Sequence, residues 1–389
     1  MAHLQPHAMV TCSTNPAVHT LQGELDFLVF DGPFFRQVEP RGRPNMSTAT
    51  MKDIAKALGV SVMTVSKVMR DRAGVAPTTR ERVLQKAAEL GYRPNLTARS
   101  LVTGQSSQVG IIVPTLLHPF FAEVLDALSS TLQQGGYAVM ISSSLENPAI
   151  EEAAIEQLLT HRLDGLIIAS CNTSHEKFKQ LAEQRVPFVL IDRFFPGFKT
   201  NFVGVDDVAV GRIATEHLIE MGCKRIAHIR GLEFTTGIGR FEGYKQALER
   251  HGISFDPSLV SPYVTADGKD WQQSYNAMRG LLQAERPDGV FCYNDPIAFA
   301  AIEVVLNAGL RIPEDIAFVG CDNLHFDTTM RAPLTSVDHH SSLVGVRAAR
   351  ILLSLLKSKT PRRPRHVALK PSLVVRQSSQ HSASEFLSA

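Results

Sequence analysis

Short apolar runs alternate with amphipathic stretches along the chain from Val109 onward. Within the stretches over 120–134, 208–221 and 297–308, apolar residues recur at helical spacing. Apolar runs separated by helices of this length are typical of parallel strands that are buried on both faces. We therefore predict seven strands, over 109–113, 137–141, 164–168, 187–191, 226–229, 289–293 and 316–319.

This alternation predicts a doubly wound α/β core over residues 107–376. A chain of 389 residues has room for two to three domains, and the α/β region alone is too long for one such sheet. Two Rossmann-like lobes with a cleft between them fit better. Ligands of open α/β sheets bind beyond the carboxyl ends of the strands, so polar residues at those ends are candidate site residues.

A pattern of three short helices precedes the α/β region, and we assign residues 49–94 to it. Thr50 and Asp53 form a capping-box pattern before a helix whose apolar residues share one face. Gly59 can end that helix in the left-handed conformation, and Ser61 is placed to cap the next helix. With a third helix predicted from Thr78 to Gly91, the segment has the form of a helix-turn-helix domain that binds duplex DNA.

Positive charge is concentrated in the same segment. Residues 50–104 hold ten Lys and Arg against four Asp and Glu, an excess of six, whereas the whole chain has a net charge of only +2. Such an excess on a small domain is typical of a protein that binds the phosphate backbone. The alternative is a solvated basic three-helix domain without a nucleic-acid partner.

The segments that flank these regions lack a sustained period. Residues 1–48 mix Pro, Gly, Thr and His, and we expect a disordered extension. A sharper hypothesis is that residues 1–45 are not translated and that Met46 is the start, which an intact mass of the native protein would test. We interpret 95–106 as a linker and the Ser-rich residues 377–389 as a flexible tail without heptads.

Composition indicates an ordinary cytoplasmic chain with ample core, because 44% of the residues are hydrophobic and 20% are charged. No apolar run is long enough for a transmembrane helix, and the N-terminus lacks the pattern of a secretory signal. The histidines have no metal-ligand spacing, so we assign no metal. Reduced thiols are expected for the five cysteines, which lack CxxC spacing, namely Cys12, Cys171, Cys223, Cys292 and Cys321.

Polar residues follow several of the predicted strands and form a candidate ligand site. Aspartate, asparagine and arginine offer the acceptors and donors that suit vicinal hydroxyls or a carboxylate. Each acidic or amide residue could instead cap the next helix, and the arginine could be a surface residue. The predicted polar set is Asp192, Asn294, Asp322 and Arg240, and the predicted apolar walls are Phe120, Phe121 and Trp271.

Two expectations concern the detail of this site. Phe120 and Phe121 are adjacent and should not both face the core of one helix, which favours at least one lining the cleft. We interpret Gly237-Ile-Gly239 as a loop before a helix that Arg240 opens, and its spacing is not that of a dinucleotide site. No Ser/His/Asp set and no Gly-rich Lys loop indicates catalysis, so we expect no enzyme and no cofactor.

Several motifs taken together resemble the LacI/GalR family of bacterial transcription regulators. The resemblance covers about residues 50–376 and implies a helix-turn-helix joined through a hinge helix to a periplasmic-binding-protein-like core. The motifs are Lys52-Asp-Ile-Ala, Gly59-Val-Ser, Thr64-Val-Ser-Lys-Val, Gly91-Tyr-Arg-Pro-Asn, Ala98-Arg-Ser-Leu, Val109-Gly-Ile-Ile-Val-Pro, Gly239-Arg-Phe-Glu-Gly, Asn294-Asp and Leu334-Thr-Ser-Val.

The resemblance implies roles for individual DNA-binding positions. Val62 and Met63 would face base edges in the major groove, where they depart from the more polar pair expected in the family and favour readout through thymine methyls and groove shape. Leu101 would be wedged into the minor groove, where it unstacks a base step. The other implied contacts are Ser61, Thr64, Ser66, Lys67, Thr79, Asn95 and Ala98.

The resemblance also places Asp192, Arg240, Asn294 and Asp322 where family members hold effectors, and Trp271 where sugar-binding relatives pack an aromatic ring on the sugar. We therefore predict a homodimeric repressor of operator DNA that responds to a small molecule, a sugar or sugar derivative. The alternatives are a solute-binding protein, a sugar-modifying enzyme with a DNA-binding domain, and a regulator whose co-effector is a protein.

Overall fold

The computed structural model describes residues 49–92, 104–262, 271–284, 286–358, 360 and 362–380, and the chain divides into two compact units, 1–94 and 95–389. The predictions for residues 1–48, for Asn95, Ala98 and Leu101 of the hinge, and for residues 381–389 lie outside the described residues. No helix within the described ranges is both long and apolar enough to cross a membrane.

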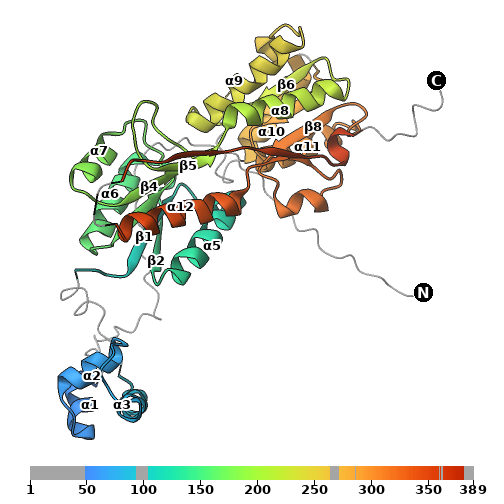
Figure 1. The fold of residues 1–389 in the computed structure, drawn as a ribbon. Helices are drawn as coiled ribbons and strands as arrows, with labels where there is room; N and C mark the ends of the chain where they lie inside the picture. The colour runs from blue at the N-terminus through green and yellow to red at the C-terminus, as the bar shows by residue number, and fades with distance from the viewer. Residues whose placement is uncertain are drawn as a thin grey trace, which may run out of the picture. The chain divides into compact units, whose positions relative to one another are not determined.

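The first unit is a three-helix domain made of α1 (Met51–Leu58), α2 (Val62–Met69) and α3 (Pro77–Glu89) (Figure 1). Thr50 and Asp53 form the expected capping box, and Gly59 ends α1 with a φ of 64°. The side chain of Ser61 accepts a hydrogen bond from the amide of Thr64 and so caps α2. The third helix begins at Pro77, one residue before the predicted Thr78, because proline fits the first helical position without losing a hydrogen bond.

The first lobe of the second unit is built on a six-stranded parallel sheet in the order β10-β5-β4-β3-β1-β2. Consecutive strand residues face opposite sides, so Ile111 packs against α5 and α12 while Ile112 packs against α6 and α7. The strands are β1 (Gln108–Val113), β2 (Ala138–Ser143), β3 (Gly165–Ile168), β4 (Phe188–Ile191), β5 (Phe202–Val205) and β10 (His366–Leu369). The helices are α5 (Pro119–Gln134), α6 (Pro148–Thr160), α7 (Glu176–Glu183) and α12 (Ser341–Leu356).

The second lobe is built on a five-stranded sheet in the order β11-β9-β8-β7-β6, in which only β11 is antiparallel to its neighbour. Helices α10 and α11 pack on one face and α8 and α9 on the other. The strands are β6 (Ile226–Ile229), β7 (Gly289–Cys292), β8 (Ala317–Cys321), β9 (Thr335–Asp338) and β11 (Ser372–Val374). The helices are α8 (Asp207–Glu220), α9 (Thr235–Arg250), α10 (Trp271–Ala284) and α11 (Asp295–Asn307), with 3-10 turns η1 (Pro257–Leu259), η2 (His325–Thr329) and η3 (Gln377–Ser379).

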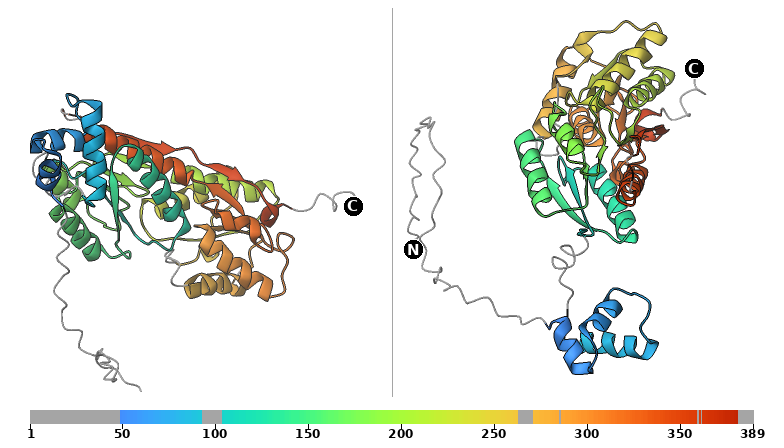
Figure 2. Two further views of the ribbon diagram at one scale, coloured as in Figure 1. Left: turned by 90° about the horizontal axis from the view of Figure 1, so that it is seen from below. Right: turned by 60° about the vertical axis from the view of Figure 1, so that its left-hand side comes forward.

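The chain passes between the two lobes three times, from β5 to α8, from β9 to α12 and from β10 to β11. Figures 1 and 2 show the two sheets side by side with these connections between them. Residues that follow β1 and β4 in one lobe contact residues of the other lobe, including residues that follow β7 and β8. The predicted two-lobed α/β architecture is confirmed.

Two expectations about local structure are wrong. Gly237 and Gly239 lie inside α9, which begins at Thr235, and do not form a loop before Arg240. Gly239 is needed because α9 packs so closely on α8 that a Cβ there would lie 2.7 Å from the Cβ of Asp207, whereas a Cβ on Gly237 would lie 2.0 Å from the carbonyl oxygen of Leu232.

The expectation of a flexible tail is wrong for residues 377–379. Residues 377–379 form a 3-10 turn in which Ser378 and Ser379 are buried. The Ser378 hydroxyl donates to the carbonyl of Phe318 at 2.7 Å and accepts from the amide of Thr335 at 2.8 Å. The serine content that suggested a flexible segment therefore satisfies buried backbone groups of the second lobe.

Candidate functional site

Twelve residues of both lobes enclose a cavity of about 30 Å³ between the sheets. Six of the seven predicted ligand-site residues line it, and Trp271 does not. The lining residues are Thr115, His118, Phe120, Phe121, Glu146, Asp192, Arg193, Arg240, Tyr293, Asn294, Asp322 and His339. We call this the inter-lobe pocket.

A hydrogen bond between His118 and Asn294 joins the lobes across the pocket. His118 is the residue before α5, and its Nδ1 caps that helix by accepting from the amide of Phe120 at 3.3 Å. Its Nε2 lies 2.9 Å from Nδ2 of Asn294, whose Oδ1 caps α11 by accepting from the amide of Ile297 at 3.1 Å. Burial lowers the pKa of His118 to about 4, because the charged imidazole loses its hydration and Arg240 and Arg193 repel it.

Asp322 follows β8 and lies between two histidines. Its Oδ2 is 3.8 Å from Nε2 of His118, and its Oδ1 is 3.4 Å from Nδ1 of His339. Oδ2 is buried and has no hydrogen-bond partner among the described residues, and burial raises the pKa of this carboxyl group well above its ordinary value. The backbone of Asp322 has a φ of 136°, a strained conformation of the kind that gathers at functional positions.

Arg240 is 2% exposed, so the interpretation as a surface arginine is wrong. Its Nε donates to Oδ1 of Asp207 at 3.0 Å, and its Nη1 donates to the carbonyl of Tyr293 at 2.6 Å. The guanidinium also lies over the Tyr293 ring, 4.2 Å from its centroid. The position depends on the crossing of α8 and α9, where a Cβ on Gly211 would lie 1.9 Å from the carbonyl oxygen of Arg240.

Arg193 follows β4 of the first lobe, and its side chain contacts the second lobe. Both terminal nitrogens donate to the carboxylate of Glu146, at 2.9 and 2.8 Å, and Nε lies 3.4 Å from Oδ2 of Asp192. The guanidinium lies 3.9 Å from the centroid of the Phe234 ring, a residue of the second lobe. Burial raises the pKa of Asp192, although Arg193 and Arg240 oppose the shift.

Phe120 and Phe121 both line the pocket and both belong to the buried core, with ring centroids 5.1 Å apart. The expectation that they cannot both be buried by one helix face is wrong. They lie in the first turn of α5, which is enclosed by its own sheet and by residues of the other lobe, including Asn294. Because both lobes cover this end of α5, two adjacent side chains can both be buried there.

The lining residues outside the predicted set are Thr115, His118, Glu146, Arg193, Tyr293 and His339. Arg193 follows β4 together with Asp192 and has the polar character that the search used, and Tyr293 adjoins Asn294. His118 precedes a predicted helix, and a capping position was the only available signal.

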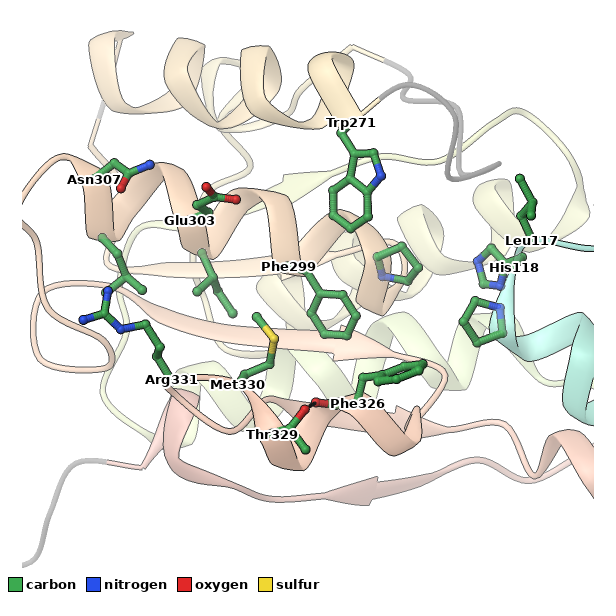
Figure 3. A pocket seen from close by; sticks show the side chains of 14 residues that line it. Leu117, His118, Trp271, Phe299, Glu303, Asn307, Phe326, Thr329, Met330 and Arg331 are labelled. Carbon is green, nitrogen blue, oxygen red and sulfur yellow. Dashed lines mark hydrogen bonds between the residues drawn. The ribbon is translucent and has the colours of Figure 1, made fainter.

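Trp271, 46% exposed, lies away from the other predicted residues, at the start of α10. It lines a separate cavity of about 720 Å³, where its ring points toward the same hollow as Phe299 and Met330 (Figure 3). Leu117 and His118 contribute to one end of this cavity from the first lobe. We call it the α11 groove, lined by Leu117, His118, Pro119, Trp271, Pro296, Phe299, Ile302, Glu303, Leu306, Asn307, Phe326, Thr329, Met330 and Arg331.

The predicted DNA-contacting residues of the helix-turn-helix lie on the exposed side of α2. Val62 and Met63 are 40% and 67% exposed. Lys67 is exposed, and Ser61 lies 2.8 Å from Thr64 through their hydroxyl groups. Ser66 and, on α3, Thr79 are half-buried. The buried residues of α2 are Val65 and Val68, which pack on the other two helices.

Two family models match the chain. Residues 50–95 match the model described as bacterial regulatory proteins, lacI family, and residues 215–379 match the periplasmic binding protein-like domain.

Curated relatives match over nearly their whole length. The HTH-type transcriptional repressor PurR of Haemophilus influenzae strain PittEE is 32% identical over 335 residues, which cover 85% of this chain and 98% of the relative. The repressor of the same name from Pasteurella multocida strain Pm70 is 33% identical over the same shares of each chain.

Solved structures of transcriptional regulators also match this chain over nearly their whole length. The lac repressor dimer bound to operator and the anti-inducer ONPF superposes with a TM-score of 0.77 at 26% identity, covering 86% of this chain and all of that one. The complex of the transcriptional regulator CelR with cellobiose has a TM-score of 0.64 at 30% identity, covering 85% of this chain and 99% of that one.

Proposed function

This chain belongs to the LacI family of bacterial regulatory proteins, and on that premise we propose that it represses transcription under the control of a small molecule bound in the inter-lobe pocket. The chain is a DNA-binding transcriptional regulator with an effector-binding core. What we add is the location of the effector and the residues that contact DNA. As a regulator of this kind it would act in the cytoplasm.

The observation that carries the effector assignment is the convergence of polar residues from both lobes on one buried cavity. His118 comes from the first lobe and meets Asn294 and Asp322 of the second. Since a ligand there contacts both lobes, its binding changes the relative stability of their closed and open arrangements. We propose a sugar or sugar derivative as the effector, because Asp192, Asn294 and Arg240 supply the polar groups that fix hydroxyls. The lobes must open to admit it, because the cavity of about 30 Å³ has room for only about one or two waters.

We propose that α2 reads the operator in the major groove through Val62 and Met63. Neither side chain makes paired hydrogen bonds to base edges, so thymine methyl groups and groove shape would carry the readout, with Lys67 adding polar contacts. Hydroxyl groups at Ser61 and Thr79 suit phosphate contacts that fix the register. The hinge residues Asn95, Ala98 and Leu101 keep their predicted role in the minor groove.

We propose that the protein acts as a homodimer and that the α11 groove is part of the interface. Apolar side chains are exposed together there, with Phe326 54% and Leu117 69% exposed. A large patch of this kind on a water-soluble lobe marks an interaction surface. Two-fold symmetry would place two α2 helices on a pseudo-palindromic operator.

A binding experiment tests this function. Fluorescence anisotropy with labelled DNA from the region upstream of the protein's own operon, at ~0.15 M salt, should show binding at least about 10³-fold tighter than to an unrelated duplex of equal length. Addition of a sugar from a screened panel should shift that affinity. Equal affinity for both duplexes would contradict the function.

A further inference from the structure

Exposed basic residues lie along one edge of the sheet in the first lobe. All six strands are parallel, so the segments that lead into them lie at a common edge, the edge of their amino ends. The segments are 104–107, 135–137, 161–164, 184–187, 197–201 and 357–365. Their described residues include seven Lys and Arg, all exposed, against one acid, Asp164. We call the seven the basic edge, namely Arg162, Arg185, Lys199, Lys357, Arg362, Arg363 and Arg365.

The positive charge of the basic edge is not neutralised within the described part of the chain. None of the seven residues has an ion-pair partner among the described residues. Arg362 donates to the hydroxyl group of Ser354 at 2.6 Å, which is a neutral partner. The carboxylate of Asp164 accepts from the amides of Ser106 and Ser107, at 2.8 and 2.9 Å, and contacts none of the seven.

The corresponding edge of the second lobe carries both signs of charge. Asp315 lies 3.5 Å from Arg286 and 3.1 Å from Arg311 there. Helices end at the amino edge of the sheet in both lobes, and cations stabilise helix ends of this kind. That effect alone would predict the same excess in both lobes, so it does not explain why the unpaired charge gathers on the first.

Two arginines of the basic edge occupy backbone positions that favour glycine. The residue after a helix cap is often left-handed, and glycine supplies that conformation without a steric penalty. After α6 and α7 this residue is Arg162 and Arg185, with φ angles of 55° and 59°. These two positions therefore give up stability at the helix end and present a positive charge instead. After α5, α8, α9 and α11 the same position is held by Gly136, Gly222, Gly252 and Gly309.

The chain joins the DNA-binding unit to the first lobe at this same edge, because residues 93–103 lead from the helix-turn-helix into the amino end of β1. In the strand order, β10 lies four strands from β1, so the loop before β10 is about 19 Å from that point along the edge. Phosphates of one DNA strand recur about every 3.4 Å along the helix axis. An edge of this length can therefore face about five or six of them.

We infer that the basic edge binds the phosphate backbone of the operator duplex outside the base pairs that α2 reads, so that the first lobe is a second DNA-binding surface. The inference rests on the proposed function and adds a contact to it. Lysine and arginine side chains at this edge neutralise phosphates and release the counterions of the duplex. Contacts to phosphates carry no sequence information, so flanking DNA of any sequence adds affinity.

An edge variant of the full chain tests this surface. It combines Arg362→Gln, Arg363→Gln and Arg365→Gln in the loop before β10. Affinity is measured by fluorescence anisotropy from ~0.05 to ~0.2 M salt with two duplexes of about 20 and about 40 base pairs, both centred on the same site upstream of the protein's own operon. A control variant removes the same charge from exposed residues of the second lobe by Lys224→Gln, Arg225→Gln and Arg250→Gln.

The expected signature is a change in salt dependence that needs flanking DNA. Each lost phosphate contact lowers the slope of log affinity against log salt by about 0.9, and we expect the edge variant to lose about two or three contacts on the long duplex. Between ~0.05 and ~0.2 M salt, the unchanged protein should therefore lose about 10- to 40-fold more affinity than the edge variant. On the short duplex the edge and control variants should bind alike. Lysine at the same three positions keeps the charge and should restore the slope.

Three results would overturn the inference. They are equal salt dependence of the edge and control variants on the long duplex, an equal loss of affinity on both duplexes, and a lower melting temperature of the edge variant with an unchanged salt slope. The last result would show that the arginines only stabilise the end of α12. Failure of the proposed function is distinct, because a chain without specific binding to either duplex contradicts the regulator function instead.

Discussion

The close crossing of α8 and α9 predicts a large effect of a single methyl group. A Cβ on Gly211 would lie 1.9 Å from the carbonyl oxygen of Arg240 and 2.9 Å from its Cα, both atoms of the backbone. Relief of that overlap requires the helices to separate by more than about 1 Å, since overpacked cores cannot absorb such contacts by rotating side chains. Gly211→Ala should therefore both destabilise the second lobe and displace Arg240 from the pocket.

The loss of unfolding free energy in Gly211→Ala can be compared with that of a matched control variant, Gly280→Ala. Overpacking costs about 1–3 kcal/mol, whereas alanine in place of glycine gains about 0.5–1 kcal/mol of helix stability. Gly280, on α10, would have no heavy atom within 4 Å of an added Cβ, so Gly280→Ala isolates the favourable part. Because both variants gain this helix stability, we expect Gly211→Ala to unfold with a free energy about 1–3 kcal/mol below that of Gly280→Ala.

Urea unfolding followed by circular dichroism and by the fluorescence of Trp271, the only tryptophan, gives this difference. The selected sugar should also bind Gly211→Ala more weakly than it binds Gly280→Ala. Equal stability of the two variants would refute the close-packing argument, and an unchanged sugar affinity would refute the link to Arg240.

Three further predictions concern the pocket, the DNA surface and the groove. Because the folded pKa of His118, about 4, lies below its ordinary value of 6.5, its contribution to stability is present above pH 6.5 and is lost as the pH falls toward 4. The melting temperature of His118→Asn, which keeps a helix cap, should therefore depend less on pH between 6.5 and 4 than that of the unchanged protein. The same pH dependence in both proteins would contradict this. Met63→Ala should weaken specific operator binding by about 1 kcal/mol through lost apolar contact, while anisotropy titrations should show unchanged binding to unrelated DNA. An equal loss of affinity for both duplexes would show that Met63 contacts the DNA backbone and not the bases. Phe326→Glu should convert dimer to monomer in analytical ultracentrifugation, whereas Ile238→Glu, on α9 and equally exposed at 54%, should not; a dimeric Phe326 variant would exclude the α11 groove.

The alternation of apolar runs and helices predicted most of the fold because parallel strands buried on both faces leave an unmistakable pattern. The strands β1, β2, β3, β4, β6, β7 and β8 lie within two residues of the predicted ranges. Strands β10 and β11 were not predicted, because they are half-exposed edge strands with mixed polar residues. Strands β5 and β9 were not predicted either, although most of their residues are buried.

We predicted a ligand site from polar residues at strand ends, and this rule found residues of the inter-lobe pocket where the side chain is held by its own strand or the helix that follows. Asp192, Asn294 and Asp322 all reach the inter-lobe pocket in this way. The rule could not find His118, because its place depends on which residue of the opposite lobe faces it. Trp271 failed for the same reason, since a resemblance in sequence does not fix the orientation of the start of α10.

The arrangement of the pocket explains how one small molecule can act on the DNA-binding state. A ligand shifts an equilibrium only by as much as its affinity differs between the two states. Asp192 and Asp322 belong to different lobes, so a ligand that contacts both carboxylates binds the closed arrangement more tightly than any open one. A coupling of about 1–3 kcal/mol changes operator affinity five- to 150-fold. Because the His118–Asn294 hydrogen bond joins the lobes and the cavity of about 30 Å³ has room for only about one or two waters, this arrangement must open before a sugar can enter.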